Sequence, residues 1–452
     1  MDSGKNMIKP HTAALHNLGC KVNGYELDIM QQKLREKGYE IVPFEEKADI
    51  YIINTCTVTG IADRKSRQML HRARKQNPDA LVVAVGCYAE TGRAQAEQDD
   101  AVDLLVGNNK KGEIVELIEA YLEGDRNDKT LGGTTYADLT EQPAYESAQL
   151  LTPTHTRAYI KIQDGCNQFC TYCLIPYARG RIRSRDPEEI LQEIRTLSEN
   201  GIREVVLTGI HVSSYGRDRG EQPDEALLQL MTRIQMLGQI RRIRLSSLEP
   251  RIMTEGFVSG ISRLSKVCPH FHLSLQSGCD ETLRRMNRHY SAQEYAEVVE
   301  RLRRYYENPA ITTDVIVGFP GETEEEYASS KAFIEQIHFY ETHVFPFSAR
   351  KGTAAAGMKG QLPGNIKQAR SEQLIQLSAQ RAQEFRSLFD GQEEEVLLEE
   401  LSDDPDYYVG HTMRYVEALY PVSAGARPGE VVEGIMHLDQ KSGQMYMEPA
   451  RQ

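Results

Sequence analysis

The chain has 452 residues, a formal net charge of −13, 40% hydrophobic residues and eight cysteines. Its length allows two to four domains with sizeable cores. No apolar run reaches the roughly 18 residues of a membrane span, and the first nine residues lack the apolar centre of a signal peptide. Eight cysteines in a chain of this length do not indicate a secreted disulfide framework. We therefore expect a cytoplasmic protein with no membrane anchor.

A parallel sheet is predicted for the first domain, residues 10–122. Three strand-like runs are separated by helical patterns over 26–37 and 61–75, in the order β-α-β-α-β. Each run is followed by a cysteine, and the three are Cys20, Cys56 and Cys87. The carboxyl ends of parallel strands share one edge of the sheet, where ligands bind. Three buried core thiols are the alternative, but their shared position favours a metal cluster.

A polar, glycine-containing stretch over 123–152 is predicted to be a linker. Soon after it comes a second triplet with the spacing C-x3-C-x2-C, formed by Cys166, Cys170 and Cys173. Three thiolates on one short loop hold three irons of a four-iron cluster and leave the fourth iron open for a substrate or cofactor. A zinc site completed by a distant histidine is the alternative.

Six strand-helix units follow the linker, over 153–385, and indicate a partial TIM-like (βα)6 barrel. The predicted strands are 157–163, 203–208, 241–246, 271–276, 311–317 and 342–347. The predicted helices are 187–199, 223–237, 280–287, 292–307 and 323–338. Residues that follow these strands should lie on the working face of the barrel, among them Thr208, Gly209, Ser247 and Gln276.

The end of the chain is predicted to be a helix over 366–390 followed by a small β-barrel over 391–450. Strand-like runs occur at 395–398, 412–416 and 430–434. Residues 391–452 hold 13 acidic and 4 basic residues, which opposes binding to nucleic-acid phosphates. Basic residues gather elsewhere, between Arg64 and Lys75 and at Arg179, Arg181, Arg183 and Arg185. The second group begins six residues after Cys173, so we expect it to contact phosphate.

The C-x3-C-x2-C spacing resembles that of the radical S-adenosylmethionine (SAM) enzymes. The chain from about residue 12 is similar to the radical-SAM methylthiotransferases, which have an N-terminal domain with three scattered cysteines, a radical-SAM barrel and a C-terminal TRAM domain. Within that family it most resembles the branch that modifies N6-threonylcarbamoyladenosine in tRNA. The matching stretches are 18–23, 54–59, 166–180, 274–290 and 313–322.

The resemblance implies two [4Fe-4S] clusters, one on Cys166, Cys170 and Cys173 and an auxiliary one on Cys20, Cys56 and Cys87. It implies that SAM lies near Tyr172. From their strand-end positions on the working face, we expect Thr208, Gly209, Ser247 and Gln276 to outline the SAM pocket. One SAM would donate a methyl group and another would supply a radical, so that a methylthio group reaches C2 of the adenine beside the anticodon. We expect tRNA as substrate, flavodoxin or ferredoxin as electron donor, and a monomer.

Two alternatives stay open at this point. The same chemistry could act on isopentenyladenosine in tRNA or on a ribosomal-protein residue. The chain could instead be a zinc-stabilised RNA-binding module without catalysis. An iron–sulfur protein is brown and a zinc module is colourless, so metal content separates the two classes.

Overall fold

The computed structural model describes residues 12–57, 60–124, 126–139, 144–153 and 155–450. Val58 and Thr59, which belong to one of the matching stretches, lie outside the described residues. The chain forms two compact units. Unit 1 consists of Met1–Thr152, Gly165–Asn167 and Cys173–Arg183, and unit 2 of Pro153–Asp164, Gln168–Tyr172 and Ser184–Gln452. No helix in the described part of the chain is long and apolar enough to cross a membrane.

Unit 1 is built on a five-stranded parallel sheet with the order β2-β1-β3-β4-β5. Its strands are β1 Thr12–Asn17, β2 Glu40–Ile41, β3 Ile50–Thr55, β4 Leu81–Gly86 and β5 Leu104–Val106. The helices are α1 Lys21–Glu36, α2 Gly60–Gln76, α3 Cys87–Thr91, α4 Arg93–Glu97 and α5 Ile114–Glu123, with short 3-10 turns at Asn108–Glu113 and Leu131–Gly133. The parallel sheet predicted from the sequence is confirmed.

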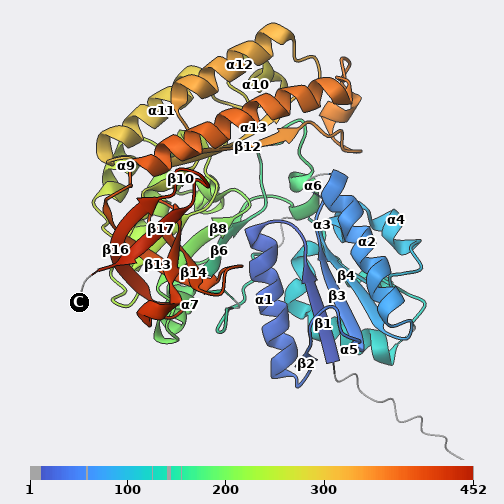
Figure 1. Cartoon of the computed structure of the whole chain (residues 1–452). Helices are drawn as coiled ribbons and strands as arrows, with labels where there is room; N and C mark the ends of the chain where they lie inside the picture. The colour runs from blue at the N-terminus through green and yellow to red at the C-terminus, as the bar shows by residue number, and fades with distance from the viewer. Residues whose placement is uncertain (1–11, 58–59, 125, 140–143, 154, 451–452) are drawn as a thin grey trace, which may run out of the picture. The chain divides into compact units, whose positions relative to one another are not determined.

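Helices cover both faces of this sheet (Figure 1). Apolar residues of α1 and α5 pack on one face, and those of α2, α3 and α4 pack on the other. The central strands β3 and β4 are buried along their whole length, as a parallel sheet between two helical layers requires.

The segment 123–152, predicted to be a linker, is part of unit 1, and its described parts bond to the edge of the sheet. The amide of Leu105 donates to the carbonyl of Lys129, and the amide of Gly107 donates to the carbonyl of Thr135. These bonds satisfy backbone groups along the edge strand β5, which would otherwise lie open. The boundaries 10–122, 153–385 and 391–450 stay predictions.

Unit 2 begins with the barrel strands β6 Ala158–Asp164, β8 Glu204–Gly209, β9 Arg242–Leu245, β10 His270–His272, β11 Ala310–Val317 and β12 Glu341–Pro346. A two-residue strand, β7, spans Arg183–Ser184. Strands β6, β8 and β9 form one parallel sheet and β10, β11 and β12 another. An isolated parallel bridge between Leu248 and Leu273 joins the two groups. The partial barrel predicted from six strand-helix units is confirmed.

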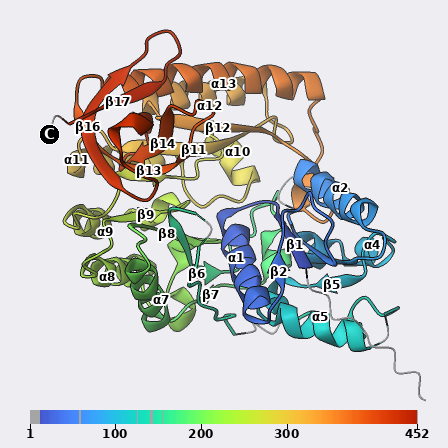
Figure 2. The same ribbon diagram turned by 60° about the horizontal axis from the view of Figure 1, so that its bottom comes forward.

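Helices cover the outside of these strands (Figure 2). They are α7 Pro187–Glu199, α8 Pro223–Gln235, α9 Glu255–Ser262, α10 Asp280–Arg285, α11 Ala292–Tyr305, α12 Glu324–Ile337 and α13 Gly364–Ser387, while the short α6 Ile175–Arg179 belongs to unit 1. Helix α9 was not predicted, because it is a single short segment capped by Thr254. Strand β10 is shorter than predicted and ends at His272. Beyond it, Leu273 and Gln276 pair with Leu248 and Val315 only through isolated bridges.

A closed five-stranded barrel ends the chain, with strands β13 Glu393–Leu401, β14 Tyr407–Thr412, β15 Glu417–Pro421, β16 Val431–Leu438 and β17 Met445–Pro449. The predicted strand over 412–416 is wrong. Tyr415 has a φ of 65° and forms the turn between β14 and β15, where its ring stacks on His411 and His270.

Acidic residues of this barrel pair with arginines near the amino ends of the preceding strands. Arg242 is buried and binds the Glu395 carboxylate at 3.0 Å, and Arg157 binds Glu399 at 2.9 Å. Arg414 of the same barrel is paired with Glu394 at 3.0 Å. Part of the negative charge of residues 391–452 therefore holds unit 2 together.

Candidate functional site

The first cysteine triplet lies at the carboxyl edge of the sheet in unit 1. Cys56 directly follows β3, and Cys87 follows β4 as the first residue of α3. The strand residues before them, Thr55 and Gly86, are paired in register. Cys20 comes three residues after the end of the neighbouring strand β1 and is the N-cap of α1. The topology therefore brings the three thiols to one edge, as the sequence predicts.

Buried polar side chains hold the loops that carry these cysteines. Asn23, in the first turn of α1, donates to the carbonyls of Leu18 at 2.7 Å and Thr55 at 3.0 Å. The hydroxyl of Ser66 accepts from the amide of Cys56 and donates back to its carbonyl, both at 3.1 Å. The loops before Cys20 and Cys56 are thus tied to each other and to α2, which fixes where their thiols lie.

Gly19 allows the first two loops to approach closely. Its φ is +109°, and a Cβ atom there would lie 2.8 Å from the Cys56 sulfur. Only glycine combines this backbone conformation with so short an approach. A side chain at position 19 would therefore push Cys20 and Cys56 apart.

Residues 173–183 also belong to unit 1, and they reach the surroundings of the first triplet. Asn108 places its amide nitrogen 3.6 Å from the Cys87 sulfur and donates to the carbonyl of Ala178 at 2.7 Å. The guanidinium of Arg179 binds both oxygens of Glu26, at 2.8 and 2.9 Å, and the Asn23 oxygen at 2.6 Å. Lys111 binds the same Glu26 at 2.6 Å. This buried network was not found from the sequence, because its members come from three separate segments.

Burial removes three of the four arginines from the predicted phosphate contacts. Arg179 is fully buried in the network with Glu26, and Arg185 is fully buried in an ion pair with Glu193. Arg183 is 3% exposed and donates to the carbonyl of Arg179. A guanidinium committed to a buried carboxylate cannot reach a phosphate without leaving its partner uncompensated. Only Arg181 is exposed among the four.

The second triplet lies on the loop after β6, with Cys170 buried and Cys166 and Cys173 partly exposed. In unit 1, the amide of Cys166 donates to the carbonyl of Gly180, and the amide of Ile175 lies 3.4 Å from the Cys173 sulfur. Gly165, with a φ of +70°, is required here because a Cβ would lie 1.8 Å from the carbonyl oxygen of Arg181.

In unit 2, the middle of this loop is docked on the segment after α10. The side chain of Asn287 donates to the carbonyls of Gln168 and Phe169, and Thr171 bonds to the carbonyls of Met286 and Arg285. The guanidinium of Arg288 lies 3.5 Å from the Cys170 sulfur. Hydrogen bonds to thiolate sulfurs raise the potential of an iron–sulfur cluster. Arg288 was not singled out from the sequence.

The predicted SAM-contacting residues lie at the carboxyl ends of the barrel strands. Thr208 and Gly209 end β8, in register with Lys161 and Gln163 of β6. Ser247 is exposed two residues after β9, whereas Gln276 is buried after β10. The ring of Tyr172 meets Phe319 edge-on at 6.3 Å, near the end of β11. Their contacts with SAM stay predictions.

A histidine missed by the sequence analysis lies on the same face. His211 follows β8, and its backbone amide donates to the side chain of Gln163 at 2.7 Å. Its ring lies 3.9 Å from the carboxylate of Glu249. Burial lowers the pKa of His211 to about 4, although Glu249 acts in the opposite direction. The imidazole is therefore neutral at pH 7.

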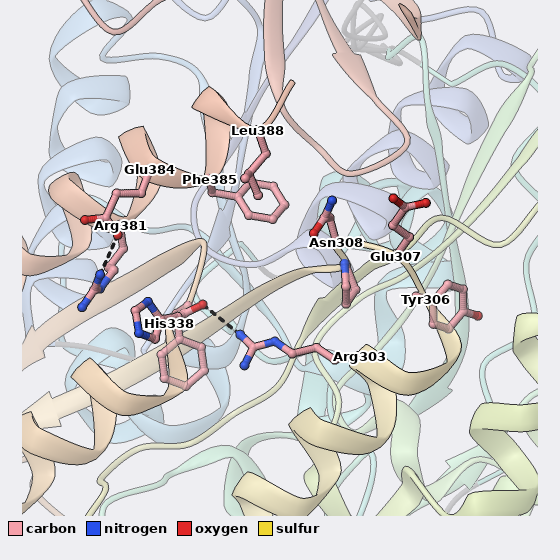
Figure 3. Close-up of a pocket in the computed structure, with 11 residues that line it drawn as sticks. Arg303, Tyr306, Glu307, Asn308, His338, Arg381, Glu384, Phe385 and Leu388 are labelled. Atoms are coloured by element: carbon pink, nitrogen blue, oxygen red, sulfur yellow. Dashed lines mark hydrogen bonds and ion pairs between the residues drawn. The ribbon is translucent and has the colours of Figure 1, made fainter. Parts of the chain in front are cut away.

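A separate surface pocket lies among α11, α12 and α13, near the amino ends of the barrel strands β11 and β12 (Figure 3). Arg303 donates to the carbonyls of Ile337 and His338 at the end of α12, and Arg381 is paired with Glu384. These arginines cap a helix end and neutralise a carboxylate. The residues that line the pocket lie apart from both cysteine triplets in sequence.

Comparisons with known proteins agree with these features. Residues 160–334 match the Radical SAM superfamily, and residues 12–107 match the Uncharacterized protein family UPF0004. The Threonylcarbamoyladenosine tRNA methylthiotransferase MtaB of Bacillus subtilis is 41% identical over 90% of this chain and 90% of its own length. The tRNA-2-methylthio-N(6)-dimethylallyladenosine synthase of Moorella thermoacetica is 37% identical over 92% of this chain and 94% of its own length. The chain belongs to the radical-SAM tRNA methylthiotransferase family.

Members of this family are enzymes that use iron–sulfur clusters and SAM, so this chain is a radical-SAM methylthiotransferase and the non-catalytic zinc module is excluded. The same fold occurs in a solved protein of low sequence identity. The radical SAM methyltransferase TsrM of Kitasatospora setae, solved with cobalamin and a [4Fe-4S] cluster, has a TM-score of 0.56 at 16% identity and covers 77% of this chain and 74% of its own. That likeness concerns the fold alone.

Proposed function

We propose that this enzyme transfers a methylthio group to C2 of N6-threonylcarbamoyladenosine beside the anticodon of tRNA. The observation that carries the proposal is the presence of two separate cysteine triplets, one at three strand ends of unit 1 and one on the loop after β6. The choice of nucleoside is supported by the relatives at 41% identity, from Bacillus subtilis and Aquifex aeolicus, which are both named for threonylcarbamoyladenosine.

Each triplet would hold one [4Fe-4S] cluster. Cys166, Cys170 and Cys173 would hold the radical-generating cluster, and Cys20, Cys56 and Cys87 the auxiliary one. The donor sets fit, since three thiols in each leave one iron open. When bound, these groups supply one-electron cleavage of SAM and a carrier for the transferred sulfur, with one SAM as methyl donor and another as radical source.

The residues of the chain would fix geometry and charge around that chemistry. Asn23 and Ser66 hold the loops of Cys20 and Cys56, and Asn108 lies against Cys87. Arg288 would donate a hydrogen bond to Cys170 and stabilise its thiolate. Tyr172, Thr208, Gly209, Ser247 and Gln276 would contact SAM. Positioning of this kind supplies much of the rate in reactions between bound partners.

Contacts with tRNA are assigned to exposed basic residues of unit 1. Arg181 is exposed after the second triplet, and Arg64, Lys65, Arg72 and Lys75 are exposed on α2. Guanidinium and ammonium groups at the surface bind phosphates with release of counterions. We further propose that the enzyme is a monomer and that flavodoxin or ferredoxin is its reductant. It would act in the cytoplasm, where tRNA is found.

Methylthiolation of isopentenyladenosine is the second candidate, because the relative from Moorella thermoacetica is named for the dimethylallyl nucleoside at 37% identity. Nucleoside analysis of tRNA separates the two. The host is a bacterial strain whose tRNA lacks the methylthio forms of both threonylcarbamoyladenosine and the dimethylallyl nucleoside. When this strain expresses this chain, its tRNA should regain the methylthio form of threonylcarbamoyladenosine. The variant with alanine at Cys166, Cys170 and Cys173 is the inactive control. Restoration of the dimethylallyl product alone would establish the second candidate and refute the first.

A further inference from the structure

Two histidines and an aspartate meet inside unit 2, away from any cysteine. His272 ends β10, Asp314 lies in β11, and His343 lies in β12. One ligand atom from each, an imidazole nitrogen or a carboxylate oxygen, lies within 4.8 Å of the other two. Two imidazoles and one carboxylate form a donor set that binds divalent transition metals.

Strand register places these side chains on one face of the sheet. His272 is paired in register with Thr312, and Asp314 with His343. The neighbouring residues Ile311 and Val315 point the other way, into the core beneath the outer helices. Ile316, two residues beyond Asp314 and so on the same face, packs against the cluster that includes Tyr172. The three donors thus lie on the inner face of the barrel wall.

The ring of His272 is already oriented for a metal. Its Nδ1 atom lies 3.0 Å from the hydroxyl of Thr312, which leaves Nε2 directed at the Asp314 carboxylate 3.3 Å away. A metal-binding histidine is typically held in this way, by a hydrogen bond at its other ring nitrogen. Bonds of about 2.0–2.2 Å to tetrahedral zinc separate neighbouring ligand atoms by about 3.3–3.5 Å. The His272–Asp314 separation already has this value.

The ring of His343 completes the set from the exposed side. It stacks beside His272 with 5.8 Å between ring centroids, and its side chain is exposed. The Asp314 side chain is 32% exposed and that of His272 is 14% exposed. A metal ion can therefore enter from solvent, and the His343 ligand atom lies within 4.8 Å of those of His272 and Asp314.

We propose that His272, Asp314 and His343 bind one divalent transition metal ion, with zinc the best match to the donors. Three protein ligands leave one tetrahedral position for water or for an oxygen ligand on a substrate. This site differs from the cysteine triplets in its chemistry, since nitrogen and oxygen donors do not hold a four-iron cluster of the kind that thiolates hold. The proposal does not rest on the identity of the modified nucleoside.

Metal analysis of the cluster-loaded enzyme tests the site. The wild type and the H272A/H343A variant are equilibrated with buffered Zn²⁺, washed, and analysed for zinc and iron by mass spectrometry. The control is H437A, because His437 is exposed in the C-terminal barrel and paired with Glu448. We expect the double variant to lose about one zinc per chain relative to the wild type and H437A, while its iron content stays the same.

Crystals of the zinc-equilibrated wild type provide a readout that folding defects do not affect. An anomalous difference peak at the zinc absorption edge between His272, Asp314 and His343 is expected. Equal zinc in the wild type and the double variant, or a peak only at the cysteines, would overturn the proposal and leave His272 and Asp314 as an ion pair.

Discussion

The two cysteine triplets are built in opposite ways. Cys166, Cys170 and Cys173 lie within eight residues of one another, so their proximity follows from covalent connection. Cys20, Cys56 and Cys87 are spread over 68 residues and meet only because β1, β3 and β4 are adjacent parallel strands. The local triplet needs only a loop of the right shape, whereas the dispersed one needs the whole sheet to fold.

The side chains that support the two triplets also differ in how far apart they lie in the sequence. Around the dispersed triplet, buried side chains from distant segments form the network of Asn23, Glu26, Lys111 and Arg179. Around the local triplet, Asn287 and Thr171 tie the loop to a single neighbouring segment, the one after α10. The dispersed site should therefore be the more sensitive of the two to changes at its periphery.

The largest expected effect separates the roles of the triplets. Alanine at Cys166, Cys170 and Cys173 should abolish SAM cleavage, while alanine at Cys20, Cys56 and Cys87 should preserve 5′-deoxyadenosine formation with dithionite and abolish methylthio transfer. Each triple variant should retain about half of the iron. Liquid chromatography and iron analysis measure these outcomes. Normal modified tRNA from either variant, or loss of all iron in one, would refute the assignment of two independent clusters.

The buried network should show the next largest effect. Glu26→Gln leaves Arg179 and Lys111 without their carboxylate partner, and breaking a buried ion pair costs about 3–5 kcal/mol of unfolding free energy. Urea denaturation measures the change. Glu36→Gln on the same helix is the control, since Glu36 is exposed and should shift stability by no more than about 0.5 kcal/mol. Equal effects of the two substitutions would contradict a stabilising role for the network.

The pH dependence of stability tests the burial of His211. Its pKa is lowered to about 4 in the folded chain, against about 6.5 for an ordinary histidine side chain. The unfolded chain therefore binds the proton more readily, so stability falls as the pH drops below 6.5, by about 2 kcal/mol between pH 7 and pH 5. His211→Gln should remove this component from urea unfolding curves recorded at the two pH values. His437→Gln, at an exposed position, should leave it intact; an unchanged loss in His211→Gln would disprove the prediction.

The smallest effect concerns tRNA binding. Arg181→Gln should lower the salt slope of tRNA binding by about one unit, because each phosphate contact releases about one counterion. Adding Arg64→Gln and Lys65→Gln on α2 should lower it further. Filter binding at several salt concentrations measures the slope, and SAM cleavage without tRNA should stay at the wild-type level. A slope unaffected by all three substitutions would refute the assignment of tRNA contacts to Arg181, Arg64 and Lys65.

Local patterns in the sequence determined the order of strands and helices in this protein and the positions of its cysteines. The alternation of strand-like and helical runs predicts both parallel β-α regions, and strands ending in Cys20, Cys56 and Cys87 predict a shared edge, because these features depend on backbone periodicity and strand direction. The C-x3-C-x2-C motif predicts a cluster with one open iron without any tertiary information. The resemblance to methylthiotransferases likewise follows from short stretches of sequence.

Only the tertiary structure decided which charges are buried. Arg179 and Arg181 are equivalent members of a basic run in the sequence. In the structure Arg179 is buried in an ion pair with Glu26, 153 positions away, whereas Arg181 is exposed. The acidic strands of the C-terminal barrel also pair with arginines that are remote in sequence. The trio of His272, Asp314 and His343 is likewise brought together only by folding. The function of a charged or metal-binding side chain depends on partners that are remote in sequence, and only folding brings them within reach.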